Sequence, residues 1–116
     1  MEKNLGKVVI APNVLVTIAR LTALSVPGVI RMSPAWTASM GRLLRRRVPG
    51  EGVRIEVEDD TVSVDLYIVV EQGANMPKLS RDVQAEVSRA IHDMVGMDVK
   101  EVNIHIQDVE IPPSED

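Results

Sequence analysis

Apolar and polar residues alternate along two neighbouring stretches in the middle of the chain. In residues 53–57 and again in residues 62–70, every second residue is Val, Ile or Leu, and the residues between them are mostly polar. A repeat of two places alternate side chains on opposite faces of a β-strand. Residues 58–61, with the sequence Glu-Asp-Asp-Thr, are typical of a turn. The pattern therefore predicts an antiparallel β-hairpin with one apolar face.

The spacing of apolar residues becomes helical on both sides of this hairpin. Residues 14–25 predict a helix that is capped by Asn13 and ended by residues 26–28, with the sequence Val-Pro-Gly. Residues 75–95 predict a longer helix that ends at Gly96. The expected apolar stripe of the longer helix consists of Met76, Leu79, Val83, Val87, Ala90, Ile91 and Met94.

Two further β-branched stretches complete the expected elements. Residues 6–11 predict a first strand, and residues 99–111 predict a last strand. The apolar positions of the last strand change parity near Gln107 and Asp108, which indicates either a bulge or two separate short segments. With residues 34–47 as a third candidate helix, the order is β-α-(α)-β-β-α-β. Helices and strands with one apolar face each predict an α+β two-layer sandwich. We expect a small mixed sheet with the helices packed on one face.

Length and composition narrow the class of protein. The chain has 116 residues, which fits one domain over residues 1–111 followed by a disordered tail over residues 112–116. It has no Cys, which excludes disulfides and thiolate chemistry, and its only aromatic residues are one Trp and one Tyr. No apolar run is long enough to span a membrane, and the first residues do not resemble a signal peptide. We therefore expect a cytoplasmic location.

Charge is spread unevenly along the chain, although the net charge is only −4. Residues 1–30 carry three Lys or Arg and one Glu, which gives +2. Residues 31–54 carry six Arg and one Glu, which gives +5, whereas residues 55–116 carry four Lys or Arg and fifteen Asp or Glu, which gives −11. The middle of the chain is thus a basic island on an acidic protein.

The chemistry-bearing residues do not form a recognisable catalytic pattern. His92 and His105 are expected to be surface residues, and the carboxylates of Asp59 and Asp60 belong to an exposed turn rather than a cleft. The glycines of residues 50–52 precede a strand, whereas phosphate-binding glycines precede a helix. We expect no catalytic residue, no cofactor and no metal.

The basic stretch of residues 33–47 is open to three interpretations. It could be an amphipathic helix whose apolar side packs on the core and whose arginines are solvated. It could instead be a contact surface for a partner or an anionic membrane, with Trp36 as the interfacial anchor. Nucleic acid is the third candidate, because arginines bind phosphate without reading sequence. The expected partner-binding residues are Trp36, Met40, Arg42, Leu43, Leu44, Arg45, Arg46 and Arg47.

Several stretches together resemble the bacterial alkaline shock protein family, also called the envelope stress response family. The resemblance runs from residue 6 to residue 109 and rests on the order of these stretches. Asn13 stands where many members have an acid, Val95 where many have Thr, and residues 33–50 are rich in Arg where the family is often rich in Gly. The matching stretches are 6–14 (GKVVIAPNV), 18–19 (IA), 26–29 (VPGV), 52–57 (GVRIEV), 64–73 (VDLYIVVEQG), 83–87 (VQAEV), 94–99 (MVGMDV) and 102–106 (VNIHI).

The resemblance implies a small cytoplasmic α+β domain without known catalytic activity, associated with cell-envelope stress. It also implies that some members are held at the membrane by a separate anchor protein and self-associate beneath it. We therefore expect a non-enzymatic scaffold that contacts a protein partner, such as a membrane anchor, and that forms a homo-oligomer. Peripheral contact with an anionic membrane is a further expectation. The alternative is a nucleic-acid-associated module that uses the arginines of residues 42–47.

Overall fold

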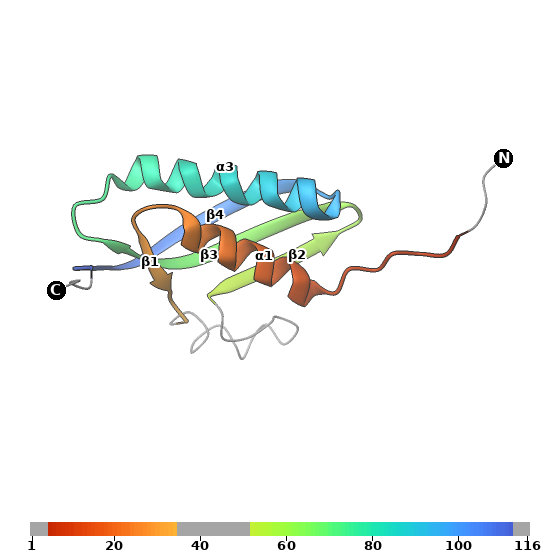
Figure 1. The fold of residues 1–116 in the computed structure, drawn as a ribbon, viewed down its shortest axis with the longest axis horizontal. Helices are drawn as coiled ribbons and strands as arrows, with labels where there is room; N and C mark the ends of the chain where they lie inside the picture. The colour runs from red at the N-terminus through yellow and green to blue at the C-terminus, as the bar shows by residue number, and fades with distance from the viewer. Residues whose placement is uncertain (1–4, 35–51, 113–116) are drawn as a thin grey trace.

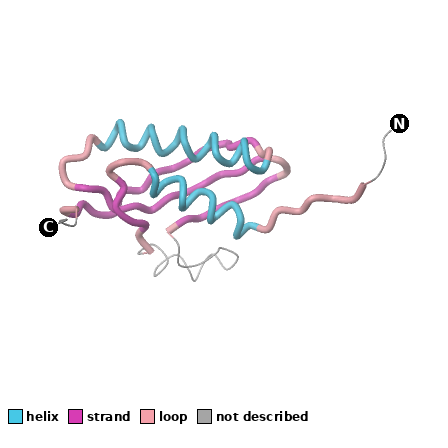
Figure 2. Tube along the Cα trace, viewed as in Figure 1, coloured by secondary structure: helices cyan, strands magenta, loops and turns pink. Residues whose placement is uncertain are grey.

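The fold is an α+β sandwich of one helical layer and one mixed sheet, as predicted (Figure 1). The computed structural model describes residues 5–34 and 52–112. Figure 2 shows both helices on the same face of the strands. The elements in chain order are α1 (Pro12–Ser25), β1 (Val29–Met32), β2 (Val53–Glu58), β3 (Thr61–Glu71), α3 (Met76–Val95) and β4 (Asp98–Glu110).

Strand β3 is the centre of the sheet. On one side it pairs with β4 in parallel along its whole length. On the other side, β2 pairs antiparallel with its first half and β1 pairs antiparallel with its second half. Because β1 and β2 run in the same direction along the same side of β3, they fill one strand position in two pieces. The predicted hairpin is confirmed, with Glu58 opposite Thr61 at its turn.

Of the two alternatives for the last strand, the bulge is confirmed. Ile106 of β4 lies opposite Ile68, and Asp108 lies opposite the next residue, Val69. Gln107 is therefore an extra residue in β4, which explains the change of parity in the sequence.

Helix α3 begins and ends as the sequence predicts. The Asn75 side chain accepts a hydrogen bond of 3.1 Å from the Lys78 backbone N–H, and Gly96 ends the helix with a φ of 77°. The expected apolar stripe is wrong at its two ends, because Met76 is 37% exposed and Met94 is 69% exposed. Both residues lie in terminal turns, beyond the stretch that packs on the sheet. The buried residues of the stripe are Leu79, Val83, Val87 and Ile91.

Helix α1 begins two residues earlier than expected, at Pro12 instead of Val14. Pro12 occupies its first turn and Ala11 is the N-cap, without a side-chain cap. Proline suits this position because the first helical N–H has no partner within the helix. Asn13 therefore lies inside the first turn, and its predicted capping role is wrong.

The predicted strand over residues 6–11 is wrong as well. These residues form no strand, and residues 5–11, which we call the N-terminal arm, lead away from the body of the molecule (Figure 1). The side of β3 opposite β4 is already filled by β1 and β2, so that position is closed to the arm. Strand β1 was not expected, because four residues are too few to show a repeat.

The core lies between the sheet and the two helices and is aliphatic, as the composition predicts. The central strand contributes alternate side chains, such as Val64 and Leu66, that are fully buried. Helix α1 contributes Leu15 and Ala19 from the opposite layer. Burying aliphatic surface of this kind stabilises the fold by about 25 cal/mol per Å².

Candidate functional site

A row of polar side chains crosses the face of the sheet that the helices leave open. Arg54 of β2, Asp65 of β3 and Asn103 of β4 lie opposite one another on three adjacent strands. Asp65 Oδ2 lies 3.3 Å from Arg54 Nη1, and Asp65 Oδ1 accepts a hydrogen bond of 3.2 Å from Asn103 Nδ2. The side chains of Arg54 and Asp65 are only 22% and 17% exposed. These charges are therefore held in place rather than freely solvated.

The next row along the strands is aromatic. Tyr67 of β3 lies opposite His105 of β4, and their rings stack with centroids 4.3 Å apart and planes 7° from parallel. His105 Nε2 lies 3.1 Å from Asp65 Oδ1, so the stack is tied to the polar row. We call Arg54, Asp65, Tyr67, Asn103 and His105 the Asp65 cluster.

Tyr67 is partly enclosed by its surroundings. Burial raises the pKa of the Tyr67 hydroxyl above its ordinary value, and the negative charge of Asp65 raises this pKa further, while Arg54 lowers it. The hydroxyl therefore stays protonated at neutral pH and keeps its capacity to donate a hydrogen bond.

Strands β1 and β2 are separated by a gap, and this gap lies beside Tyr67 of β3. The Tyr67 carbonyl accepts a hydrogen bond of 2.7 Å from the Ser33 N–H, and the Tyr67 N–H donates one of 2.8 Å to the Gly52 carbonyl. Gly52 has a φ of 72°, and a Cβ added there would lie 2.9 Å from both Met32 Cβ and the Ser33 carbonyl oxygen. The chain thus leaves the sheet at Ser33 and returns to it beside the same residue.

The partner-binding residues expected from the sequence lie outside the described residues. These are the eight residues Trp36, Met40, Arg42, Leu43, Leu44, Arg45, Arg46 and Arg47. They belong to the connection between Ser33 and Gly52, so the structure describes where this connection leaves and rejoins the sheet. The assignment of a contact surface to these residues stays a prediction.

Of the titratable residues named from the sequence, three are exposed and one is partly buried. His92 is a surface residue with a 62% exposed side chain near Asp93, and Asp59 and Asp60 are exposed at the hairpin turn. His105, in contrast, is engaged with Asp65 and Tyr67. That neither histidine is catalytic stays a prediction.

The carboxylate of Asp65 is engaged within the cluster. Its Oδ2 lies 3.3 Å from Arg54 Nη1, and its Oδ1 lies 3.1 Å from His105 Nε2 and 3.2 Å from Asn103 Nδ2. Within the described ranges, no group of three or more His, Cys, Asp or Glu side chains is placed to hold a metal ion. What the cluster offers is a rigid set of polar groups beside a flat pair of rings.

Sequence reasoning did not single out this cluster. The hairpin alone places Arg54 opposite Asp65, because a tight turn fixes the register of its two strands. The contact between Asp65 and His105 depends on the parallel pairing of β3 with β4, which no local pattern reports.

Comparisons with known proteins connect this fold to the cell envelope. Residues 1–111 match the alkaline shock protein 23 family, which is described as having a cell envelope-related function. The uncharacterized protein YqhY of Bacillus subtilis is 33% identical over 105 residues, which cover 90% of this chain and 78% of that protein. The uncharacterized protein YloU of Bacillus subtilis is 26% identical over 113 residues, which cover 96% of this chain and 94% of that protein.

No solved structure matches the chain. In the part of the chain that the structure describes, no helix combines the length and the apolar character needed to cross a bilayer. The family match extends over nearly the whole chain and confirms the resemblance noted in the sequence. The chain therefore belongs to the alkaline shock protein 23 family, whose function is related to the cell envelope.

Proposed function

We propose that this chain is a non-enzymatic scaffold of the cell-envelope stress response, which acts in the cytoplasm through protein–protein contacts next to the membrane. The envelope-related function of its family supports the assignment to the cell envelope. The Asp65 cluster supports the mode of action, because its charged groups are paired with one another and its stacked rings form a flat surface. Such a surface suits a protein partner. Polar groups that already bond to one another hold a fixed shape that a partner can fit.

The single observation that carries the proposal is the place where the basic connection begins and ends. Ser33 and Gly52 both bond to the backbone of Tyr67, within the Asp65 cluster. The connection between them contains Trp36 and the four arginines Arg42, Arg45, Arg46 and Arg47. An acidic partner, such as a membrane-anchor protein with an acidic segment, would be attracted to these arginines and oriented on the rings.

The experiment compares two variants that change the charge equally. In the first, Arg42, Arg45, Arg46 and Arg47 are all changed to Gln. In the matched control, four exposed basic residues of α3 and β4 are changed to Gln instead, namely Lys78, Arg81, Arg89 and Lys100. Tagged wild type and both variants are used to capture partners from membranes of the native host at low and high salt, and the bound proteins are quantified by mass spectrometry.

We expect the first variant to lose its envelope partner and the control to retain it. The difference should be largest at low salt, where charges act over longer distances. If both variants capture the same partner equally well, the basic connection has no role in binding and this proposal is wrong. An additional His105→Gln variant tests the non-enzymatic part, because loss of a defined catalytic turnover in that variant would contradict it.

A nucleic-acid-associated module is the alternative of another class, and the arginines are the observation in its favour. The helix-free face of the sheet argues against it, because Asp65, Glu56 and Glu58 lie along this face and repel phosphate. A single aromatic ring pair also gives little surface for stacking bases. Binding to duplex and single-stranded nucleic acid across a salt series tests this alternative. Tight binding that weakens steeply with salt would favour it.

A further inference from the structure

The outer edge of β4 is open. Strand β4 pairs with β3 on one side, and among the strands that the structure describes none pairs with its other side. Such an edge presents backbone N–H and C=O groups that can hydrogen-bond to another extended chain. Many natural edges are protected by bulges, and β4 has extra residues at Lys100 and Gln107. Between them, β4 pairs regularly from Glu101 to Ile106, and this stretch of its edge suits an added strand.

The register shows which residues of β4 point their backbone groups outward. Tyr67 directs its N–H and its C=O to the side of β3 where β1 and β2 lie. Successive residues of a strand alternate in this direction, so Leu66 directs its own groups toward β4. In a parallel pair, the residue opposite such a residue points its N–H and C=O away. Ile104, which lies opposite Leu66, therefore presents both groups at the open edge, and the same holds for Val102 and Ile106.

A side chain of α3 already bonds to one of these outward groups. Gln84 Nε2 donates a hydrogen bond of 3.0 Å to the carbonyl oxygen of Val102. The Gln84 amide thus lies where the backbone N–H of an added strand would donate. Gln84 is exposed and its side chain is long, so it can move aside for such a strand.

The side chains beside the open edge differ between the two faces of the sheet. On the helix side, Ile104 and Ile106 pack against the core but are only partly buried. On the opposite face, Asn103 and His105 carry polar groups. An added strand with alternating aliphatic and polar residues would cover the two isoleucines and keep its polar residues on the open face.

The charges along β4 favour a basic partner. Asp98 and Glu101 are exposed near the beginning of the strand, and Asp108 is exposed near its end, whereas Lys100 is the basic residue of β4. A segment with Lys or Arg at both ends would therefore be attracted to this edge. A second copy of β4 is disfavoured, because antiparallel pairing of two such edges would bring their acidic ends together.

We propose that the edge of β4 from Glu101 to Ile106 binds an extended segment of a different protein, which adds to the sheet as a further strand. The segment has aliphatic residues at alternate positions and Lys or Arg at its ends. Its backbone bonds to Ile104 and Ile106, and it takes the place of Gln84 at the Val102 carbonyl. Strand addition of this kind takes its affinity from backbone hydrogen bonds and its specificity from alternate side chains. The inference goes beyond the proposed function, whose partner is acidic, and does not depend on it.

The first test measures binding of a synthetic peptide of about nine residues, Lys-Lys-Val-Thr-Ile-Thr-Val-Lys-Lys, to the full chain by fluorescence anisotropy. Two further versions carry backbone N-methyl groups either on the aliphatic residues or on the threonines. In a strand these two sets of N–H groups point to opposite edges. We therefore expect one version to bind at least about tenfold more weakly and the other to bind like the parent. Equal binding of all versions, or no binding of the parent up to about 1 mM, would overturn the proposal.

The second test changes the chain and keeps the parent peptide. Ile104→Pro removes an outward N–H, and proline is accepted in a strand where the N–H faces away from the sheet. Gln84→Ala frees the Val102 carbonyl oxygen. We expect Ile104→Pro to lose the peptide and Gln84→Ala to bind it about two- to tenfold more tightly, as fits one gained hydrogen bond. Gln72→Ala is the matched control, because Gln72 is an exposed glutamine outside β4 and should leave the Kd unchanged. Unchanged or weaker binding in Gln84→Ala would contradict the exchange at Val102.

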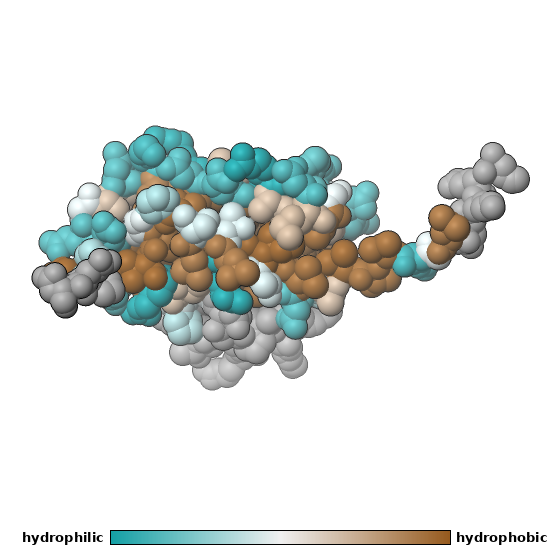
Figure 3. Space-filling view, viewed as in Figure 1, coloured by the Kyte–Doolittle hydropathy of each residue, from teal (hydrophilic) through white to brown (hydrophobic). Residues whose placement is uncertain are grey.

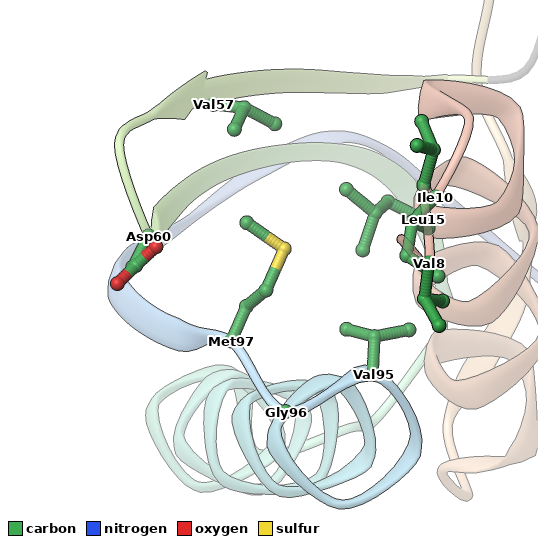
Figure 4. A pocket seen from close by; sticks show the side chains of 9 residues that line it. Val8, Ile10, Leu15, Val57, Asp60, Val95, Gly96 and Met97 are labelled. Atoms are coloured by element: carbon green, nitrogen blue, oxygen red, sulfur yellow. The ribbon is translucent and has the colours of Figure 1, made fainter. Parts of the chain in front are cut away.

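The third test measures amide hydrogen exchange in the wild-type chain, so it does not depend on the folding of a variant. The N-terminal arm is another surface where the peptide could bind, because its apolar side chains are exposed (Figure 3), with Val8 89% exposed. The base of the arm borders a hollow into which Met97, the residue before β4, points (Figure 4). With the peptide bound, we expect exchange to slow at least about tenfold at Ile104 and Ile106 and to stay unchanged at Val8. Slower exchange in the arm instead of at the edge would overturn the proposal.

Light scattering of the chain without peptide tests a second copy as the occupant of the edge. We expect Ile104→Pro to have the same mass in solution as wild type. A wild-type dimer that becomes a monomer in Ile104→Pro would assign the edge to a second copy and overturn the proposal.

Discussion

Tyr67 and His105 stack across two parallel strands, with their ring centroids 4.3 Å apart. The same Tyr67 bonds through its backbone to Ser33 and Gly52, at the two ends of the basic connection. Tyr67 therefore takes part both in the aromatic stack and in the hydrogen bonds at the gap between β1 and β2. The titration of its hydroxyl reports on this region.

The pKa of Tyr67 should be measurable without a label, because the chain contains one Tyr. Burial and then the charge of Asp65 raise this pKa, so its ultraviolet titration should have a midpoint above the ordinary value of about 10. Asp65→Asn should lower the midpoint, and Asp93→Asn, on the exposed side of α3, should not. A wild-type midpoint at or below the value of free tyrosine would show that the environment of Tyr67 differs from the one described.

The same shift predicts how stability depends on pH. The pKa of Tyr67 is higher in the folded than in the unfolded chain, so its contribution to stability is complete below about pH 10 and is lost as the pH rises through the folded pKa. Tyr67→Phe should therefore unfold with a weaker pH dependence than wild type above about pH 10. Denaturant unfolding at several alkaline pH values measures this difference, and identical slopes for the two proteins would contradict it.

Removing the acceptor of the Asp65 cluster should destabilise the fold. Asp65→Ala leaves Arg54, Asn103 and His105 without the carboxylate to which they bond, at a site where only 17% of the Asp65 side chain is exposed. We expect a loss of about 1 to 3 kcal/mol in the free energy of unfolding. Asp93→Ala is the control, because its side chain is 66% exposed. Equal losses in the two variants would mean that the cluster adds no stability.

Gly52 should be much less tolerant of Ala than Gly73. Both residues have positive φ, of 72° and 92°, so both changes carry a similar backbone cost. At Gly52 the new Cβ would also lie 2.9 Å from Met32 Cβ and from the Ser33 carbonyl oxygen, whereas at Gly73 nothing lies within 4 Å. We expect Gly52→Ala to lose at least about 1 kcal/mol more than Gly73→Ala. Thermal unfolding of both variants measures the difference, and similar losses would argue against the close approach of Gly52 to Ser33.

Val87→Asp should abolish cooperative unfolding. Val87 is completely buried in the middle of α3, and an unpaired charge there costs several kcal/mol out of a total stability of about 5 to 15 kcal/mol. Ala85→Asp introduces the same charge on the exposed side of the same helix and should melt close to wild type. A Val87→Asp variant that also melts within a few degrees of wild type would mean that the inward face of α3 is assigned wrongly.

The sequence predicts the parts of this fold that depend on local periodicity. The repeat of two predicts β2 and β3, and the buried positions from Leu79 to Ile91 follow the helical repeat. Periodicity gives the face of a helix but not how far along its axis the sheet extends, so Met76 and Met94 were expected to be buried. β-propensity likewise reports an extended conformation and not a free place beside β3, so residues 6–11 were expected to form a strand.

The candidate site is less predictable because it depends on contacts between distant residues. The pair of Arg54 and Asp65 follows from the hairpin register alone. The pair of Asp65 and His105 requires the parallel register of β4 on β3, and these two strands are separated in the chain by α3. The meeting of Ser33 and Gly52 requires β1, which is too short to leave a signal in the sequence.

The gap between β1 and β2 is a position where this fold can accept inserted residues. Because Ser33 and Gly52 bond to the same residue, the two ends of the connection are already as close as the ends of a tight turn. The entropy of closing such a loop grows slowly, by about 0.6 kcal/mol for each doubling of its length. Residues 35–50 should therefore be replaceable by a short Gly-rich linker or a longer foreign segment at little cost to the sheet. The gap in the edge strand thus provides a grafting site, where proteins with the same sheet and helices can differ in the inserted segment.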